Sequence, residues 1–181
     1  MNPLTTVFLD RDGTINVRAD EGDYVRTADD LRLLPGAARA VAMLNRAAIK
    51  TVLITNQRGV ARGLMSADQL DQVHARLAQE LRREGAHLDA VYVCPHPADS
   101  CVCRKPGPGL IHQALREDPA IRLEEAVVVG DADTDIQLGL GLGIRTVRVA
   151  PCPGIDGVQA SHTCPDLEAA VSWILQQGLA R

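Results

Sequence analysis

Aromatic side chains are scarce in this chain of 181 residues, where one Trp, two Tyr and one Phe make up 2% of the total. We therefore expect a core built mainly from Leu, Val, Ile and Ala. An excess of charge of one sign is also missing, since 19 Lys and Arg stand against 23 Asp and Glu, giving a formal net charge of -4. This balance argues against broad binding to nucleic acid or to an anionic membrane surface.

Long apolar runs are absent as well. No stretch approaches the ~18 consecutive apolar residues of a membrane span. The first residues lack the basic segment and apolar segment of a secretory signal. We therefore expect no membrane span and a cytoplasmic location. The length fits one domain covering residues 1–181.

Short apolar runs rich in Val and Ile alternate with helical patterns along the chain. The runs predict strands at 6–9, 51–54, 90–93, 126–129 and 146–149, and the patterns predict helices at 33–44, 70–81, 110–115, 136–142 and 166–177. This alternation predicts an α/β fold, a Rossmann-like parallel sheet with helices on both faces. Residues 151–165, rich in Pro, Gly and Cys, are expected to form an irregular loop. The stretch 15–35 is too short for a cap domain, so we expect loops to cover the site.

Two carboxylates follow the first predicted strand. Asp10 comes at its carboxyl end, and Asp12 can face the same way because side chains alternate along an extended backbone. Gly13 allows a tight turn, and Thr14 offers a hydroxyl group. The pair predicts a site for Mg²⁺ and a phosphoryl group, and the alternative is an Asp-Gly turn with solvated acids.

Polar groups follow other predicted strands at the same edge of the sheet. Thr55, with Asn56, Gln57 and Arg58 after it, follows the second strand and can bind phosphoryl oxygens. Lys105 precedes the third helix and can neutralise a phosphoryl group, and Asp131 follows the fourth strand and can bind Mg²⁺ with Asp10. Each of these features alone is also compatible with an ordinary polar loop, a solvated lysine or a helix cap.

A cysteine-rich segment lies between the third strand and Lys105. Cys94, His96, Cys101 and Cys103 supply three thiolates and one imidazole, the four ligands of a structural Zn²⁺ site. The alternative is three free thiols and a surface histidine. A metal in this loop, residues 94–103, would fix the directions of Arg104 and Lys105. Cys152 and Cys164 have no assigned role, and buried packing is the default.

The order acid pair, Thr, Lys, acid resembles the four motifs of the haloacid dehalogenase superfamily over nearly the whole chain. The resemblance implies that Asp10 attacks phosphorus to form an aspartyl phosphate and that Asp12 protonates the leaving oxygen and then activates water. It also implies that Thr55 and Lys105 hold the phosphoryl group and that Mg²⁺ binds Asp10, the backbone carbonyl of Asp12, and Asp131. Two nearby carboxylates disfavour joint ionisation, which helps to keep Asp12 protonated, and the cation is expected to keep Asp10 ionised.

The motifs also resemble one branch of that superfamily, the heptose 1,7-bisphosphate 7-phosphatases of nucleotide-activated heptose synthesis. The resemblance rests on the segment 8–16, on 55–57, on the Cys-x-His and Cys-x-Cys loop and on 103–106. It implies a capless fold, a sugar bisphosphate substrate, and Mg²⁺ and Zn²⁺ as cofactors. Because one chain supplies the complete set of site residues, we expect that a monomer can work. It places these residues at the substrate: Glu21, Gly22, Asp23, Tyr24, Thr55, Asn56, Gln57, Arg58, Arg104 and Lys105.

Two other functions remain open at this point. Histidinol-phosphate phosphatases share most of these motifs and would act on a different phosphate ester. A phosphoacceptor signalling domain also uses an Asp, a Thr and a Lys on an α/β sheet. Such a domain needs neither a zinc loop nor a second Asp two residues after the first.

Overall fold

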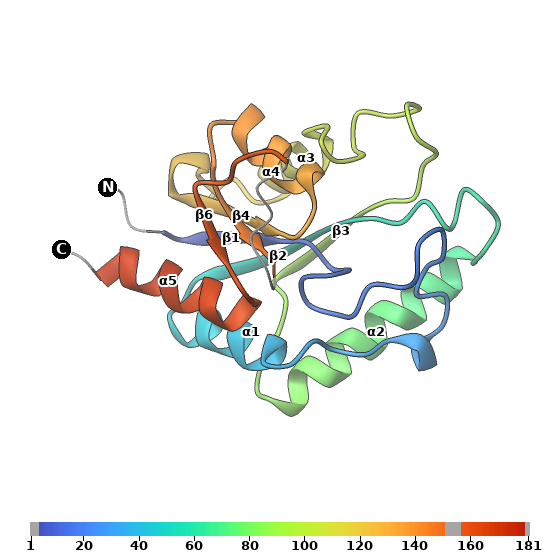
Figure 1. The fold of residues 1–181 in the computed structure, drawn as a ribbon, viewed down its shortest axis with the longest axis horizontal. Helices are drawn as coiled ribbons and strands as arrows, with labels where there is room; N and C mark the ends of the chain where they lie inside the picture. The colour runs from blue at the N-terminus through green and yellow to red at the C-terminus, as the bar shows by residue number, and fades with distance from the viewer. Residues whose placement is uncertain (1–3, 151–156, 180–181) are drawn as a thin grey trace.

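A parallel sheet of six strands forms the centre of the computed structural model, which describes residues 4–150 and 157–179 (Figure 1). The strands are β1 (Thr6–Leu9), β2 (Lys50–Asn56), β3 (Ala90–Cys94), β4 (Ala126–Gly130), β5 (Arg145–Val149) and β6 (His162–Cys164). Their order is β3-β2-β1-β4-β5-β6. The chain order reverses at β1, which lies between β2 and β4, and such a reversal opens a crevice at the carboxyl ends of the strands.

Helices cover both faces of this sheet, so the predicted fold class is confirmed. The helices α1 (Ala37–Arg46), α2 (Ala67–Arg83) and α5 (Leu167–Leu179) lie on one face, and α3 (Gly109–Glu117) and α4 (Asp133–Gly141) lie on the other (Figure 1). Two short 3-10 helices, η1 (Ala28–Asp30) and η2 (Leu123–Glu125), complete the elements. None of the helices in the described part of the chain is long and apolar enough to cross a membrane.

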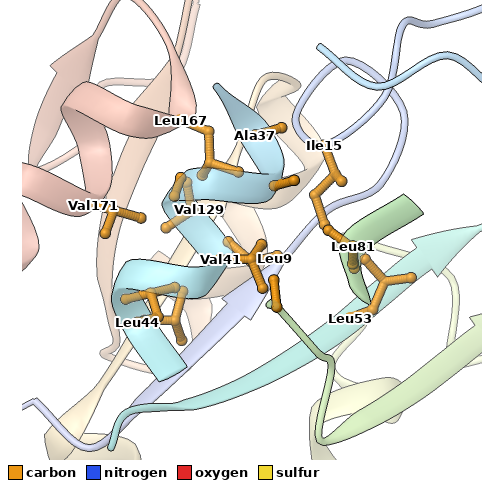
Figure 2. Packing of buried hydrophobic residues seen from close by; sticks show 14 of the residues in the cluster. Leu9, Ile15, Ala37, Val41, Leu44, Leu53, Leu81, Val129, Leu167 and Val171 are labelled. Carbon is orange, nitrogen blue, oxygen red and sulfur yellow. The ribbon is translucent and has the colours of Figure 1, made fainter. Parts of the chain in front are cut away.

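The core consists of two apolar layers, one on each side of the sheet. Side chains alternate along β1, so Val7 and Leu9 pack toward α1 and α5 while Phe8 packs toward α3 and α4. Figure 2 shows the first layer, in which Leu9 and Val129 meet residues of α1 and α5. Burial of each large aliphatic side chain contributes about 1.5–3 kcal/mol, so many small contributions replace the scarce aromatic ones.

The start of α2 follows the signals in its sequence. Ser66 Oγ accepts a hydrogen bond from the Gln69 backbone at 3.1 Å, and Gln69 Oε1 accepts one from the Ser66 backbone at 2.8 Å. This capping box satisfies two N–H groups that the first turn would leave unpaired. The predicted stripe on this helix is buried, and its members are Leu70, Val73, Leu77 and Leu81. The helix is therefore held firmly against the sheet.

The structure corrects the prediction of an irregular loop over 151–165. Residues 151–156 lie outside the described part, but β6 follows them and pairs in parallel with β5 through Val149 and Cys164. The strand has only three residues and gains its hydrogen bonds from β5, so no local periodicity reveals it. Cys164 is 5% exposed and packs in the core, as expected, whereas Cys152 lies outside the described residues.

The stretch between β1 and α1 contains no cap domain within the described residues. It folds back on itself, since the Val17 backbone donates to the carbonyl of Arg32 at 2.8 Å, and its one regular element is η1. Leu33 belongs to this stretch and bridges to Asn16, so α1 begins at Ala37, later than its apolar stripe predicts. The carboxyl ends of the strands are thus covered by a loop.

Candidate active site

Three parallel strands bring polar residues to the same edge of the sheet. Leu9 of β1 lies level with Leu53 of β2 and with Val129 of β4. The residues that follow, Asp10 after β1 and Asp131 after β4, therefore meet in the crevice beside β1. Thr55 and Asn56 end β2 at this edge, and Cys94 ends β3 beside them.

Lys105 makes the central contact of the site. Its Nζ donates to Asp10 Oδ1 at 2.6 Å and to the carbonyl of Ile54 at 2.8 Å, and it pairs with Asp135 Oδ1 at 2.7 Å. Lys105 is 3% exposed, and burial acts to lower its pKa, but Asp10 and Asp135 outweigh burial and raise it. The lysine is therefore charged where a phosphoryl group would bring further negative charge.

Asn56 fixes the backbone of this lysine. Its Nδ2 donates to the Lys105 carbonyl at 3.1 Å, and its Oδ1 accepts from the Lys105 N–H at 3.0 Å. This reciprocal pair of hydrogen bonds joins the end of β2 to the loop that follows β3. Asn56 thereby holds the loop and the lysine against the crevice.

Three carboxylates gather beside the lysine. Asp10, Asp131 and Asp135 each offer an oxygen, and these atoms lie within 4.8 Å of one another. Asp131 Oδ1 is buried and has no hydrogen-bond partner among the described residues. Burial and the neighbouring Asp10 raise the pKa of Asp131 to about 6, although Arg18 acts in the opposite direction. Three acids against one buried lysine leave an excess of negative charge and free hard oxygens, a donor set that fits Mg²⁺.

Gly13 allows the loop after β1 to pass close to these acids. Its φ is +88°, and a Cβ at this position would lie 2.0 Å from Asp131 Oδ2. Any other residue would clash with Asp131 and would strain the backbone. The Asp-Gly pair in the sequence therefore marks a close approach between two strand ends.

Asp12 is held by donors on several sides. Arg11 Nη2 donates to its Oδ1 at 3.1 Å and to its Oδ2 at 3.0 Å, Asn16 Nδ2 donates to Oδ1 at 2.9 Å, and Gln57 Nε2 donates to Oδ2 at 2.8 Å. Gln57 Nε2 also reaches the hydroxyl of Thr55 at 2.8 Å. Asp12 lines the crevice with Asp10, so its carboxylate is fixed at the entrance to the site.

The surroundings of the acid pair oppose the expected protonation of Asp12. Burial raises the pKa of Asp10 to about 6, more than Lys105 lowers it. Burial also acts to raise the pKa of Asp12, but Arg11, Asn16 and Gln57 together hold it below its ordinary value. The two nearby carboxylates do repel, as Asp12 contributes to the raised pKa of Asp10, but the Arg11 side chain favours ionisation of Asp12.

A cavity of about 520 Å³ opens over these groups. Its walls include predicted substrate residues from two loops and from the end of β2, and these are Glu21, Gly22, Asp23, Tyr24, Asn56, Arg104 and Lys105. Arg104 Nη1 is buried and has no hydrogen-bond partner in the part of the chain that the structure describes. A cationic group without a partner is thus placed beside a cavity of a size that fits a small phosphorylated molecule.

Three predicted substrate residues are not among those that line this cavity. Thr55 is 1% exposed and Gln57 is 0% exposed, and both contact Asp12 or its partners. Arg58 donates to the Tyr24 hydroxyl at 3.3 Å, so it supports the covering loop. Tyr24 also packs on Gly59, where a Cβ would lie 2.9 Å from the ring.

The four predicted zinc ligands come together in one cluster. Their ligand atoms all lie within 4.8 Å of one another, with Cys94 Sγ 3.5 Å from Cys101 Sγ and His96 Nδ1 3.1 Å from Cys103 Sγ. Thiolates bound to one tetrahedral Zn²⁺ are separated by roughly 3.8 Å, which follows from a Zn–S bond of about 2.3 Å. The spacing of the cluster therefore fits a tetrahedral metal site.

Sequence reasoning gave no role to several residues of this site. The sequence indicates Asp135 only as a further carboxylate after the fourth strand, although its position four residues after Asp131, in the first turn of α4, brings it to the same site. The sequence does not indicate a role for Arg11 in the site, because an isolated basic residue is usually solvated. In the structure its side chain is fully buried. His74 on α2 contacts Arg11, and Arg18 pairs with Asp131 at 2.7 Å, and both contacts depend on the tertiary fold.

The fold and this site define a phosphatase of the haloacid dehalogenase type. A family model described as HAD-hydrolase-like matches residues 102–167. A Bordetella bronchiseptica protein named D-glycero-beta-D-manno-heptose-1,7-bisphosphate 7-phosphatase is 33% identical and covers 96% of this chain and 99% of its own length. The chain therefore belongs to the heptose-1,7-bisphosphate 7-phosphatase family.

Two further comparisons agree with this assignment. A Mycobacterium bovis protein named for the alpha form of the substrate is 45% identical over 72% of this chain and 68% of its own length. The crystal structure of D,D-heptose 1,7-bisphosphate phosphatase from B. bronchiseptica, complexed with magnesium and phosphate, has a TM-score of 0.84 at 32% identity. It covers 96% of this chain and 99% of that one.

Proposed function

We propose that this chain hydrolyses the 7-phosphate of D-glycero-D-manno-heptose 1,7-bisphosphate, a step in the synthesis of nucleotide-activated heptose. The observation that carries the proposal is the buried contact of Lys105 with Asp10 beside three clustered acids, in a chain that belongs to this phosphatase family. Residues 1–181 would act as one phosphatase domain in the cytoplasm. Because every proposed site residue comes from one chain, a monomer suffices.

The proposed mechanism begins with attack by Asp10 on the phosphorus of the 7-phosphate. A bond forms between a carboxylate oxygen of Asp10 and phosphorus, the bond from phosphorus to the heptose oxygen breaks, and Asp12 gives that oxygen a proton. Because Arg11, Asn16 and Gln57 hold the pKa of Asp12 below its ordinary value, Asp12 would have to take up this proton as the substrate binds. The products of this half-reaction are the heptose 1-phosphate and an aspartyl phosphate.

Water completes the cycle. Asp12 removes a proton from water, the water oxygen bonds to phosphorus, and the bond to Asp10 breaks, which releases inorganic phosphate. Arg11 and Gln57 support this second step because they favour the ionised form of Asp12. Lys105 and Thr55 are proposed to hold the phosphoryl group throughout.

Mg²⁺ would be held by Asp10, the backbone carbonyl of Asp12, and Asp131, and Asp135 would support the site through Lys105. When bound, the cation neutralises charge on the phosphoryl oxygens. Zn²⁺ would be held by Cys94, His96, Cys101 and Cys103 and would serve the structure of the loop alone, because four protein ligands leave no open position.

The covering loop is proposed to set the choice of substrate. Glu21, Gly22, Asp23 and Tyr24 line the cavity above Asp10 and would lie over the sugar. The unpartnered Arg104 would bind the second phosphate, since a guanidinium group matches phosphate geometry with two parallel donors.

The direct test compares three substrates by kcat/KM with Mg²⁺ present. These are the alpha and beta anomers of the heptose 1,7-bisphosphate and histidinol phosphate, the substrate of the alternative that the relatives do not favour. We expect one of the two heptose anomers to give the highest value. A higher value for histidinol phosphate would refute the proposed substrate while leaving the phosphatase chemistry in place.

A further inference from the structure

Arg11 is the largest fully buried side chain in the described part of the protein, and the mechanism above assigns it no contact with substrate. Its Nη2 contacts both oxygens of Asp12, and its Nε donates to Asp12 Oδ1 at 3.3 Å. These contacts fix the plane of the Asp12 carboxylate as well as its distance. The orientation of Asp12 therefore depends on what holds Arg11.

The remaining end of the Arg11 guanidinium meets α2. Its Nη1 lies 3.1 Å from Nε2 of His74. An arginine has only donors, so His74 Nε2 must be the acceptor in this hydrogen bond. His74 is consequently neutral, with its proton on Nδ1, and burial together with Arg11 lowers the pKa of its ring to about 4.

We propose that His74 is a positioning residue, which accepts a hydrogen bond from Arg11 and so holds the guanidinium group that orients Asp12. The inference rests on the proposed role of Asp12 in proton transfer. Arg11 has several rotatable bonds, and without an acceptor at Nη1 its buried N–H would be unsatisfied. By accepting the hydrogen bond from Nη1, His74 restrains rotation of the Arg11 side chain at the end of the guanidinium group opposite Asp12.

The position of His74 makes α2 part of the support of the site. This helix begins with the capped Ser66, and its buried stripe fixes it against the sheet. The loop that leads from β2 into α2 also carries Gln57, which donates to Oδ2 of Asp12. Asp12 is thus oriented through α2 by way of His74 and Arg11, and from the preceding loop by way of Gln57.

The test compares two substitutions of His74 in the full chain with Mg²⁺ and Zn²⁺ bound. His74→Leu removes the acceptor, whereas His74→Gln keeps an acceptor oxygen on a neutral side chain. His87→Leu is the matched control, because this histidine has a side chain that is 60% exposed and contacts Asp89 away from the crevice. All variants are checked for folding by Tm before kinetics.

We expect His74→Leu to lower kcat about 10- to 100-fold, the scale of a misplaced catalytic group, with KM changed by less than about twofold. His74→Gln should recover most of the lost kcat, and His87→Leu should match the wild type. A wild-type kcat in His74→Leu would overturn the inference, as would a folded His74→Gln variant as slow as His74→Leu. A general packing role predicts no rescue by glutamine, so this comparison separates the two.

A second measurement does not depend on activity. ¹⁵N NMR of the histidine rings at neutral pH should show His74 as the Nδ1–H tautomer, and Arg11→Lys should alter its Nε2 signal. An Nε2–H tautomer or a charged ring would overturn the inference even in an inactive protein. If the wild-type protein hydrolysed none of the three phosphate esters, the proposed function would fail while the NMR result still decided the Arg11 contact.

Discussion

Lys105 Nζ lies 2.6 Å from Oδ1 of Asp10, and both side chains are almost completely buried. This pair joins the loop after β3 to the end of β1, across the strand between them. Two further acids, Asp131 and Asp135, lie beside this pair, and each has a carboxylate oxygen within 4.8 Å of one from Asp10. In the candidate active site, the cation of Lys105 therefore balances several carboxylates, so we expect stability and catalysis to depend on the same charges.

Lys105→Met is expected to weaken both folding and catalysis. Removing one member of a buried pair leaves a buried charge without a partner and costs about 3–5 kcal/mol. We expect a clearly lower Tm for the metal-free variant, a larger rise in Tm on adding Mg²⁺ than in the wild type, and a large loss of phosphate release. Lys50→Met, which removes the half-exposed pair with Asp118, is the control and should change Tm little. A wild-type Tm in Lys105→Met would contradict this account.

Asp10→Asn is expected to reduce phosphate release at saturating Mg²⁺ by at least about 10³-fold, because the amide is a poor nucleophile toward phosphorus. The measurement is release of inorganic phosphate from heptose 1,7-bisphosphate by protein freed of contaminating phosphatases. Asp71→Asn, an exposed position on α2, makes the same chemical change and should leave the rate as it is. Retention of normal activity by Asp10→Asn would rule out the covalent mechanism.

Arg18→Gln is expected to strengthen Mg²⁺ binding. Arg18 Nη2 lies 2.7 Å from Asp131 Oδ2, so the guanidinium group competes with a cation for this carboxylate. The pair is partly exposed, and we expect the dissociation constant to fall about two- to fivefold. Titration calorimetry with Mg²⁺ measures it without substrate. Arg26→Gln removes only the pair with Asp23 and should not change the constant, and weaker Mg²⁺ binding by Arg18→Gln would show that Arg18 does not compete.

Loss of the proposed Zn²⁺ from the loop is expected to lower stability and activity together. Cys103→Ser should reduce the zinc content of the protein, lower Tm by about 5–10 °C and reduce kcat, because Arg104 and Lys105 directly follow this proposed ligand. Elemental analysis and thermal unfolding give the two values. Cys164→Ser, outside the cluster, should keep its zinc whatever its Tm. Full zinc content in Cys103→Ser would remove this cysteine from the ligand set.

The pH dependence of stability is expected to reveal His74. In the folded protein its pKa is about 4, below the ordinary 6.5, so between these values the unfolded chain binds more protons. Stability from this group therefore falls as pH decreases from about 6.5 to about 4, by on the order of 2 kcal/mol. Asp10 and Asp131 titrate in this window in both proteins, so the difference between wild type and His74→Gln isolates the histidine.

Denaturant unfolding at pH 7 and pH 4.5 provides the measurement. The free energy of unfolding of the wild type should fall more between these two values than that of His74→Gln. Equal changes in the two proteins would mean that His74 is charged or solvated in the folded state. That outcome would also weaken the contact with Arg11.

Periodicity was enough to predict five of the six strands and the covering of both sheet faces. Val7 and Leu9 alternate with Phe8 between two apolar layers, and such a pattern is local. The strand His162–Cys164 was not predicted because its three residues form a strand only through their pairing with β5. Local propensity therefore described five strands, including β3 at one edge of the sheet, and failed for the three-residue strand β6 at the other edge.

For the candidate site as well, some features could be predicted from the sequence and others could not. Parallel strands end at one edge, so the positions of Asp10 and Asp131 follow from strand order alone. The ionisation of Asp12 could not be predicted, because it depends on the direction in which the Arg11 side chain turns. That direction depends on α2, a helix whose contact with Arg11 no spacing in the sequence reveals.

The cysteine cluster has a consequence for how this loop can change during evolution. His96 Nδ1 lies 3.1 Å from Cys103 Sγ, so the two sides of the loop meet at its base, two residues before Lys105. The tip between His96 and Cys101 is therefore mechanically separated from the lysine. Insertions or deletions at the tip should be tolerated, and a peptide tag placed there should leave turnover intact.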